Sequence, residues 1–230
     1  MLPEHIVIIP DGNRRWATAH SKTIVEGYQA GIAKIIDALT WCGELNLKIL
    51  TFWGFSTENF FRNKNEVNNL LHLFNTKLDE ALREDTFKKY DIRVRILGKL
   101  SLMPTEIRHK IRTLEKITEK HKKHSLNILF AYGGRQEIVD ACNAILREYR
   151  RGRIKRVTEE IFASHLYTNG LPYPDLIIRT SGEQRLSGLM PWQSAYSELY
   201  FSKKLWPDFT KADLIKALNE YSRRQRRFGH

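Results

Sequence analysis

The sequence predicts a single α/β domain in which helices flank a mainly parallel sheet. Two observations favour this class. Short apolar runs alternate with longer segments of helical periodicity, and most of these runs are largely apolar, as in strands covered on both faces. No repeat, linker or break in composition divides the chain, and 42% of its 230 residues are apolar, enough for one substantial core. We therefore expect one domain over residues 1–230.

The strands are predicted from short runs rich in β-branched, aliphatic and aromatic residues. Most of these runs are largely apolar, but the third alternates apolar residues with arginine, which is typical of a half-exposed strand. The expected strands are Ile6–Ile9, Lys48–Phe55, Ile92–Leu97, Leu126–Tyr132, Asp175–Arg179 and Glu198–Phe201.

The helices are predicted from apolar residues that recur every three or four positions. Pro104 stands where the first turn of a helix tolerates proline, and Thr158 begins a capping box that Ile161 leaves incomplete. The expected helices are Tyr28–Leu45, Glu66–Leu82, Pro104–Lys120, a segment from Gly134 to about Arg150, Thr158–Leu166 and Lys211–Tyr221.

The charge and the cysteine content indicate which class of partner and which cellular compartment to expect. Lysine and arginine number 38 against 26 acidic residues, and the net charge of +12 favours an anionic partner such as nucleic acid, an acidic membrane surface or a phosphorylated small molecule. Cys42 and Cys142 lie in apolar helical contexts and are expected to be reduced core residues. No secretory signal and no apolar run of ~20 residues is present, so we expect a cytoplasmic protein.

A first candidate site follows the first strand, where the chain reads "IVIIPDGNRRW". Ligands of open α/β sheets bind beyond the carboxyl ends of strands, where free backbone N–H groups favour an anion. Arg14 and Arg15 add positive charge, and the Asp11 carboxylate could hold a divalent cation that bridges to phosphate oxygens. The alternative is that Asp11 caps a helix and the arginines are merely solvated.

A second candidate site lies in "LIIRTSGEQRLSGLMPWQSAYSELYF". Arg179 ends a strand, and Arg185 and Ser187 follow in one loop, so two guanidinium groups and a hydroxyl could clamp a diphosphate. Glu198 follows on the next strand. Two strand-end sites of this kind indicate two phosphorylated substrates.

A third cluster, in "FWGFSTENFFRNKNEV", places Ser56, Glu58, Asn59 and Arg62 at the end of a strand, although Ser56 or Thr57 could be a plain N-cap. The chain has no Walker-type phosphate loop, no G-x-G-x-x-G and no H-E-x-x-H. The basic segment "SRRQRRFGH" lacks the interleaved aromatic residues of a nucleic-acid arm.

Five blocks of the sequence together resemble one family. In order, "HIVIIPDGNRRWA", "FWGFSTENF", "LNILFAYGGRQEI", "RTSGEQRLSGLMPWQSAYSELYF" and "RRFG" are similar to the motifs of cis-prenyltransferases, the undecaprenyl diphosphate synthase family. The resemblance covers His5 to Gly229. It implies a parallel six-stranded sheet flanked by helices, a homodimer, and Mg²⁺-dependent transfer of a prenyl group from an allylic diphosphate to isopentenyl diphosphate, which gives a cis-prenyl diphosphate.

The resemblance also implies roles for individual residues. The expected catalytic residues are Asp11, Asn13, Ser56 and Asn59, with Glu66 at a further active-site position, and the expected metal-associated residues are Asp11 and Glu198. The expected substrate-binding residues are Gly12, Arg14, Arg15, Trp16, Tyr28, Arg62, Arg179, Arg185, Ser187, Arg227 and Gly229, the last two in an R-x-G segment that reaches a neighbouring subunit. A hydrophobic tunnel for the prenyl chain is expected along Trp53, Phe55, Leu70, Phe74 and Leu129.

Several residues depart from the usual family pattern. Ile24 and Tyr28 stand where an arginine and a histidine normally contact the allylic diphosphate. Other departures are Pro10, Arg14, Gly188 and Pro191. Similar changes occur in lavandulyl-type diphosphate synthases, which join two allylic units in an irregular, non-head-to-tail fashion.

We therefore expect ordinary cis elongation first and irregular coupling to dimethylallyl diphosphate as the alternative. A non-catalytic subunit of a heteromeric prenyltransferase would be expected to lose the metal aspartate, which is retained here as Asp11. A basic nucleic-acid-binding protein would show steep salt dependence with generic DNA or RNA. We expect no nucleic-acid partner and at most peripheral membrane contact for product release.

Overall fold

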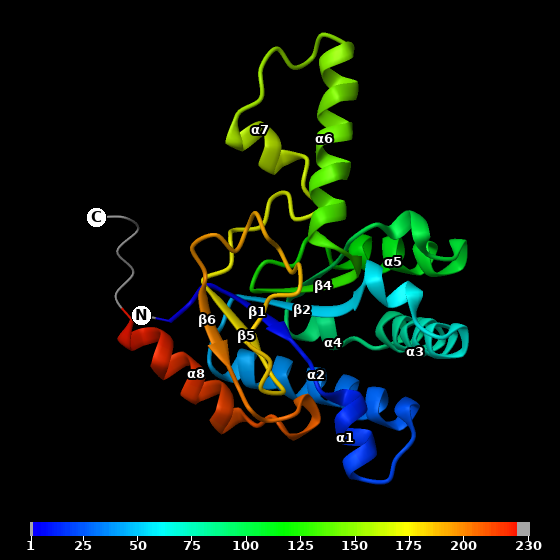
Figure 1. Cartoon of the computed structure of the whole chain (residues 1–230), viewed down its shortest axis with the longest axis vertical. Coiled ribbons are helices and arrows are strands. Elements are labelled where there is room, and N and C mark those ends of the chain that lie inside the picture. The colour runs from blue at the N-terminus through cyan, green and yellow to red at the C-terminus, as the bar shows by residue number, and fades with distance from the viewer. Residues whose placement is uncertain (1, 225–230) are drawn as a thin grey trace.

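Six parallel strands form a sheet at the centre of the molecule, in the order β3-β4-β2-β1-β5-β6 (Figure 1). The computed structural model describes residues 2–224, and every strand pairing in it is parallel. The strands are β1 His5–Ile9, β2 Ile49–Ser56, β3 Ile92–Leu97, β4 His124–Tyr132, β5 Leu176–Arg179 and β6 Glu198–Phe201. The predicted α/β class and all six predicted strands are confirmed.

Eight α-helices lie in the described residues, and they include every helix that the periodicity predicts. They are α1 Asn13–Ala19, α2 Ile24–Glu44, α3 Lys64–Arg83, α4 Thr86–Lys89, α5 Thr105–Thr118, α6 Gly134–Arg150, α7 Glu159–Ser164 and α8 Lys211–Arg223, with short 3₁₀ turns η1 Thr57–Phe61, η2 Leu100–Leu102 and η3 Trp206–Asp208. Helix α2 begins four residues before its predicted start because Thr23 and Glu26 form a complete capping box. Within the described residues, no helix combines the length and the hydropathy that a membrane span requires.

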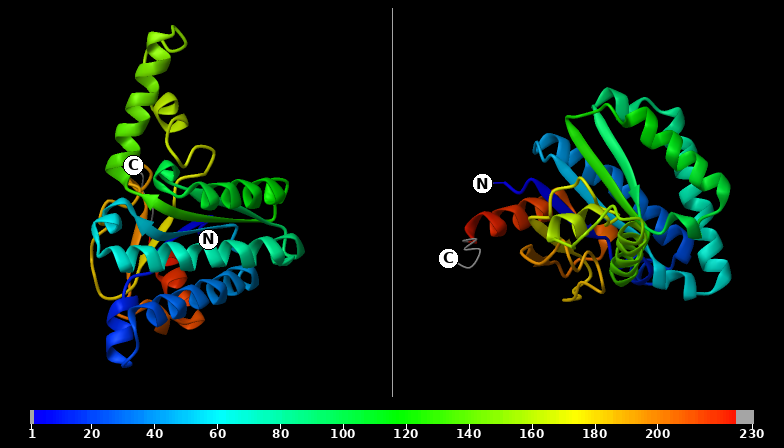
Figure 2. Two further views of the ribbon diagram at one scale, coloured as in Figure 1. Left: turned by 90° about the vertical axis from the view of Figure 1, so that its right-hand side faces the viewer. Right: turned by 90° about the horizontal axis from the view of Figure 1, so that it is seen from above.

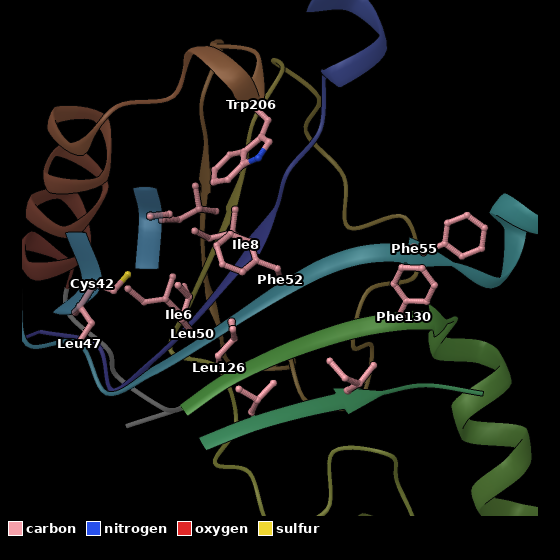
Figure 3. Packing of buried hydrophobic residues seen from close by; sticks show 14 of the residues in the cluster. Ile6, Ile8, Cys42, Leu47, Leu50, Phe52, Phe55, Leu126, Phe130 and Trp206 are labelled. Atoms are coloured by element: carbon pink, nitrogen blue, oxygen red, sulfur yellow. The ribbon is translucent and has the colours of Figure 1, made fainter. Parts of the chain in front are cut away.

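The two faces of the sheet are covered differently. Helices α2, α3, α5 and α8 pack on one face, where Ile6, Ile8 and Phe52 meet Trp206 in the larger core cluster (Figure 3). The other face is covered largely by the irregular chain around β5, which contributes Leu189 and Met190 to a smaller cluster. Helix α6 starts at the sheet and projects away from it (Figures 1 and 2).

Two sequence predictions about the core are wrong. Cys42 is buried but Cys142 is exposed, since α6 buries the helical face that carries Glu137 and Ala141 and position 142 lies to one side of it. Of the predicted tunnel residues, Leu129 belongs to the smaller cluster and Trp53 packs against it, whereas Phe74 packs on the larger one. Because adjacent residues of a strand point to opposite faces, Leu129 does not line the space beside α3.

The chain changes direction across the sheet between β1 and β5. After β1, the next strand in the sequence, β2, pairs with β1 on one side. After β5, the next strand in the sequence, β6, pairs with β5 on the opposite side of the sheet. Ile9 and Arg179, the last residues of β1 and β5, are register partners. Ligands of open parallel sheets bind beyond the strand ends at such a switch point.

Helix α1 lies on α2 through a glycine. A Cβ atom at Gly27 would lie 2.6 Å from the backbone oxygen of Asn13 and 2.8 Å from Cβ of Ala17, closer than real Cβ contacts occur. The absence of a side chain at Gly27 therefore sets how closely the two helices approach.

We expect Gly27→Ala to lower the free energy of unfolding by about 1–3 kcal/mol, because α1 would have to move off α2. Gly43→Ala is the matched control in the same helix, since nothing lies within 4 Å of a Cβ there. That control should raise stability by about 0.5–1 kcal/mol through helix propensity alone. Urea unfolding measures both, and a Gly27→Ala protein as stable as the Gly43→Ala protein would contradict this packing.

Candidate functional site

A cavity of about 1230 Å³ opens at the carboxyl ends of β1, β2, β4 and β5. Its wall includes residues that end or follow each of these strands: Asp11, Ser56, Gly134 and Arg179. Because parallel strands bring their carboxyl ends to one edge, four distant parts of the sequence meet there. This is the position at which the sequence predicts a ligand.

The pair of Asp11 and Arg179 lies at the switch point between β1 and β5. Arg179 Nη2 donates to Asp11 Oδ2 at 2.7 Å, and Arg179 Nη1 donates to Ser187 Oγ at 2.9 Å. The Arg179 side chain is only 6% exposed, and its Nε has no hydrogen-bond partner among the described residues. The guanidinium is thus held in place by protein and presents fixed positive charge to the cavity.

Asp11 remains ionised in this environment. Burial would raise the pKa of Asp11, but the hydrogen bond and the charge of Arg179 outweigh it, and Ser181 and Arg15 add to the effect, so the pKa lies below its usual value. Arg15 Nη2 lies 3.6 Å from Asp11 Oδ1 and donates to Ser181 Oγ at 2.6 Å. The cavity therefore holds one carboxylate between two guanidinium groups.

The turn after β1 requires glycine at position 12. Gly12 has φ of 109°, and a Cβ atom there would lie 2.9 Å from Cδ2 of Leu205. The backbone N–H of Trp206 also donates to the backbone carbonyl oxygen of Asp11 at 3.0 Å, which fixes the turn against η3. Asn13 follows directly; it is the first residue of α1, and it lines the cavity.

Tyr28, Arg62 and Glu66 form a hydrogen-bonded cluster that joins α2, η1 and α3. The Tyr28 hydroxyl donates to Glu66 Oε1 at 2.7 Å and accepts from Arg62 Nη1 at 3.0 Å, and Arg62 Nη1 lies 3.1 Å from Glu66 Oε1. Burial raises the pKa of Tyr28, and the hydrogen bond to Glu66 raises it further, so the phenol stays protonated. Tyr28 and Arg62 line the cavity beside Ile24, and Arg14 lies close enough to lower the pKa of Tyr28 in part.

Ser56 and Asn59 are both caps and cavity residues. Ser56 Oγ accepts from the Asn59 N–H at 3.2 Å, and Asn59 Oδ1 accepts from the Ser56 N–H at 2.9 Å, a complete capping box for η1. The N-cap interpretation of Ser56 is thus confirmed. Both residues also lie in the cavity wall.

Four predicted site residues within the described chain do not line the cavity: Trp16, Glu66, Arg185 and Glu198. Glu66 instead binds Tyr28 and Arg62, which do line it. Trp16 points away, since its Nε1 donates to Asp208 Oδ1 at 2.8 Å. Arg185 is 60% exposed and donates to Glu183 Oε2 at 2.5 Å. The remaining predicted positions, Arg227 and Gly229, lie outside the described residues.

Glu198 is the last of these residues, and it lies at the edge of the sheet opposite to the one where Asp11 lines the cavity. It begins β6 and is the register partner of Leu176, which begins β5. Its carboxylate accepts from Arg224 Nη1 at 2.6 Å. Within residues 2–224, no group of three or more His, Cys, Asp or Glu side chains could hold a metal ion.

Two cavity residues were missed from the sequence. Gly134 and Arg135 lie in the wall directly after β4. The signal was available, because "YGGR" follows a buried strand just as the first motif does. With Arg14, Arg15, Arg62 and Arg179, Arg135 makes five arginines in the wall against the two carboxylates of Asp11 and Glu58.

A buried carboxylate holds the loop between β5 and β6, which carries Ser187, in position. Glu137 is fully buried and accepts from the Tyr132 hydroxyl at 2.6 Å, from the Tyr167 N–H at 2.9 Å and from Gln193 Nε2 at 3.0 Å. The Gly134 N–H also donates to the Gly188 oxygen at 3.1 Å. The loop that carries Ser187 is therefore attached to the start of α6.

Comparisons with known proteins agree with this geometry. A family model described as "Putative undecaprenyl diphosphate synthase" matches residues 9–229. The tritrans,polycis-undecaprenyl-diphosphate synthase (geranylgeranyl-diphosphate specific) of Methanocaldococcus jannaschii is 44% identical over 99% of this chain and 83% of its own length. The isoprenyl transferase of Thermotoga maritima is 46% identical over 99% of this chain and 97% of its own length.

Solved structures give the same result. The lavandulyl diphosphate synthase of Lavandula x intermedia, solved in complex with dimethylallyl diphosphate, has a TM-score of 0.94 at 36% identity and covers 100% of this chain and 99% of its own. A probable undecaprenyl diphosphate synthase of Campylobacter jejuni has a TM-score of 0.81 at 31% identity with the same coverage. The chain belongs to the undecaprenyl diphosphate synthase family of cis-prenyltransferases.

Proposed function

We propose that this enzyme transfers the prenyl group of an allylic diphosphate to isopentenyl diphosphate, releasing diphosphate and forming a cis-prenyl product. The observation that carries the proposal is the Asp11–Arg179 pair at the switch point, inside a cavity whose wall holds five arginines. Diphosphate leaves an allylic carbon only if its growing negative charge is stabilised, and fixed guanidinium groups do so without reorganisation.

Two groups of residues support two diphosphate sites. On one side, Arg14, Arg15 and the turn at Gly12 suit the allylic diphosphate. On the other, Arg179 and Ser187 suit the diphosphate of the acceptor. Arg185 would join the second site by leaving Glu183, which its exposed side chain allows.

Asp11 also suits Mg²⁺. One of its oxygens accepts from Arg179 at 2.7 Å, the other lies 3.6 Å from Arg15, and the residue lines the cavity, where a carboxylate suits a cation. Mg²⁺ in phosphate sites is commonly bound by one or two carboxylates with the substrate phosphates and water. When bound there, the ion would supply charge that neutralises the leaving diphosphate.

The prenyl chain is proposed to extend from the cavity along the face of the sheet that carries α3. Phe55 lies in the cavity wall, stacks on Phe130 with ring centroids 5.2 Å apart, and Phe130 stacks on Phe74 at 3.8 Å. Leu70 and Phe74 of α3 are only partly buried and pack against the same cluster. This apolar row supports a tunnel without Leu129.

A second candidate reaction is irregular coupling, with dimethylallyl diphosphate as the acceptor. It is favoured by the TM-score of 0.94 to lavandulyl diphosphate synthase. Ile24 and Tyr28, which stand where the family usually has two diphosphate contacts, agree with it, since the Tyr28 hydroxyl is already bound to Glu66 and Arg62. A homodimer in which Arg227 and Gly229 reach the partner's cavity, and a cytoplasmic location, remain predictions.

Asp11→Asn should reduce turnover by at least about 100-fold, because metal-assisted departure of diphosphate contributes several kcal/mol to the rate. The assay measures diphosphate release with saturating Mg²⁺, an allylic diphosphate and isopentenyl diphosphate. Asp37→Asn is the matched control, since Asp37 lies on the exposed side of α2, pairs with Lys34 and does not line the cavity, and it should keep most of the turnover. Near wild-type turnover in a folded Asp11→Asn protein would refute the proposed reaction.

Arg15→Met should raise the KM for the allylic substrate, and Ser187→Ala should raise the KM for the acceptor. Each loses a contact to a charged diphosphate, worth about 1.5–3 kcal/mol, or at least tenfold. Arg112→Met, which removes an exposed arginine of α5, should change neither constant. Equal effects of both variants on both substrates would show that the two sites are not separate.

The natural protein should use both isopentenyl diphosphate and dimethylallyl diphosphate as acceptors. The small difference in shape between these two five-carbon diphosphates changes the binding free energy by only about 1–3 kcal/mol. We expect product from isopentenyl diphosphate and measurable coupling to dimethylallyl diphosphate when both compete. Ile24→Arg with Tyr28→His should shift the ratio toward head-to-tail product, as chromatography after phosphatase treatment would show. Exclusive head-to-tail product from both proteins would contradict irregular coupling and support cis elongation as the single reaction.

A further inference from the structure

The far end of α6 and the turn after it carry a dense group of cations. Six of the ten residues 147–156 are Lys or Arg and one is acidic. These six are called the basic tip: Arg147, Arg150, Arg151, Arg153, Lys155 and Arg156. The tip lies at the extremity of the molecule, away from the sheet (Figures 1 and 2).

The cations of the basic tip face water without partners. All six residues are exposed, and none forms an ion pair within residues 2–224. The one acid among them, Glu148, lies 3.5 Å from His165 Nε2, and Glu159 and Glu160 follow only at the start of α7. The positive charge of the tip is therefore largely uncompensated.

A structural role explains only part of this charge. Arg147 and Arg150 lie in the last turn of α6, where cations interact favourably with the helix dipole. The other four cations lie beyond the helix end, where that effect has fallen off. Between them only Ile154 turns inward, with 8% exposure, so the turn is anchored while its charged side chains remain outside.

Exposed apolar side chains flank the same cations. Leu146 is 53% exposed, Tyr149 59% and Val157 57%. Basic residues interleaved with exposed aliphatic and aromatic side chains are typical of surfaces that lie in the headgroup region of a bilayer. Single-stranded nucleic acids are instead bound on several stacking aromatics, and this segment has one.

We propose that the basic tip docks this protein on an anionic lipid bilayer. Clusters of four to eight Lys and Arg residues attract anionic lipid headgroups, and the three apolar side chains would enter the interface between them. The contact is peripheral and independent of the proposed reaction. Because α6 spans 17 residues, its start in the cavity wall lies about 25 Å from the tip, so docking leaves the cavity outside the bilayer.

Sedimentation with vesicles tests the proposal on the full chain. The vesicles are phosphatidylcholine alone and an equal mixture of phosphatidylcholine and phosphatidylglycerol. We expect the protein to sediment with the mixed vesicles, and less so as salt is raised, but not with phosphatidylcholine alone. The variant Arg150→Gln/Arg151→Gln/Arg153→Gln should bind the mixed vesicles about 100-fold more weakly, since each basic residue near the surface contributes roughly a factor of five.

The matched control is Lys120→Gln/Lys122→Gln/Lys123→Gln, which removes the same charge from three other exposed side chains that form no ion pair within residues 2–224. It should bind the vesicles almost as well as the natural protein, and both variants should keep the natural turnover with water-soluble substrates. Equal loss in the two variants would mean that net charge, not the tip, causes binding. Tighter binding of a single-stranded RNA than of mixed vesicles through the same three arginines would replace the bilayer with nucleic acid. Either result overturns the proposal.

Discussion

The ion pair between Asp11 and Arg179 is the interaction on which the rest of the site depends. It joins the ends of two neighbouring strands at a distance of 2.7 Å, across the point where the chain changes direction in the sheet. A nearly buried guanidinium needs a partner, and a carboxylate between two arginines remains ionised. The pair thus presents both signs of charge to one ligand, which suits a metal-bound diphosphate.

Other parts of the fold hold this pair in place. The turn at Gly12 packs so closely on Leu205 that no side chain fits, and Gly27 brings α1 onto α2. On the opposite side, the buried carboxylate of Glu137 attaches the loop that carries Ser187 to α6. The cavity is therefore built from strand ends and closely packed turns, and its charged groups are positioned before a substrate arrives.

Much of this arrangement could be predicted from the sequence. Largely apolar runs indicate buried parallel strands, and the predicted sites around Asp11, Ser56 and Arg179 each follow or end such a strand. The structure brings these three sites into one cavity because the carboxyl ends of parallel strands lie at one edge. The same reasoning covers Arg135, which follows a buried strand in the block "LNILFAYGGRQEI" but was not predicted as a site residue. Glu198 was matched by family position, yet it begins its strand and so lies at the other edge.

What the sequence did not predict depends on local direction and on contacts between distant segments. Trp16 follows Arg15 in the sequence, but one step on a helix turns a side chain by about 100°, toward Asp208 rather than the cavity. The cluster of Tyr28, Arg62 and Glu66 needs three elements in register, which spacing alone does not reveal. The central claim is tested most directly by calorimetric titration with inorganic pyrophosphate, with and without Mg²⁺. The account predicts that Mg²⁺ tightens binding to the natural protein and has little effect on Asp11→Asn; the same Mg²⁺ dependence in both proteins would contradict it.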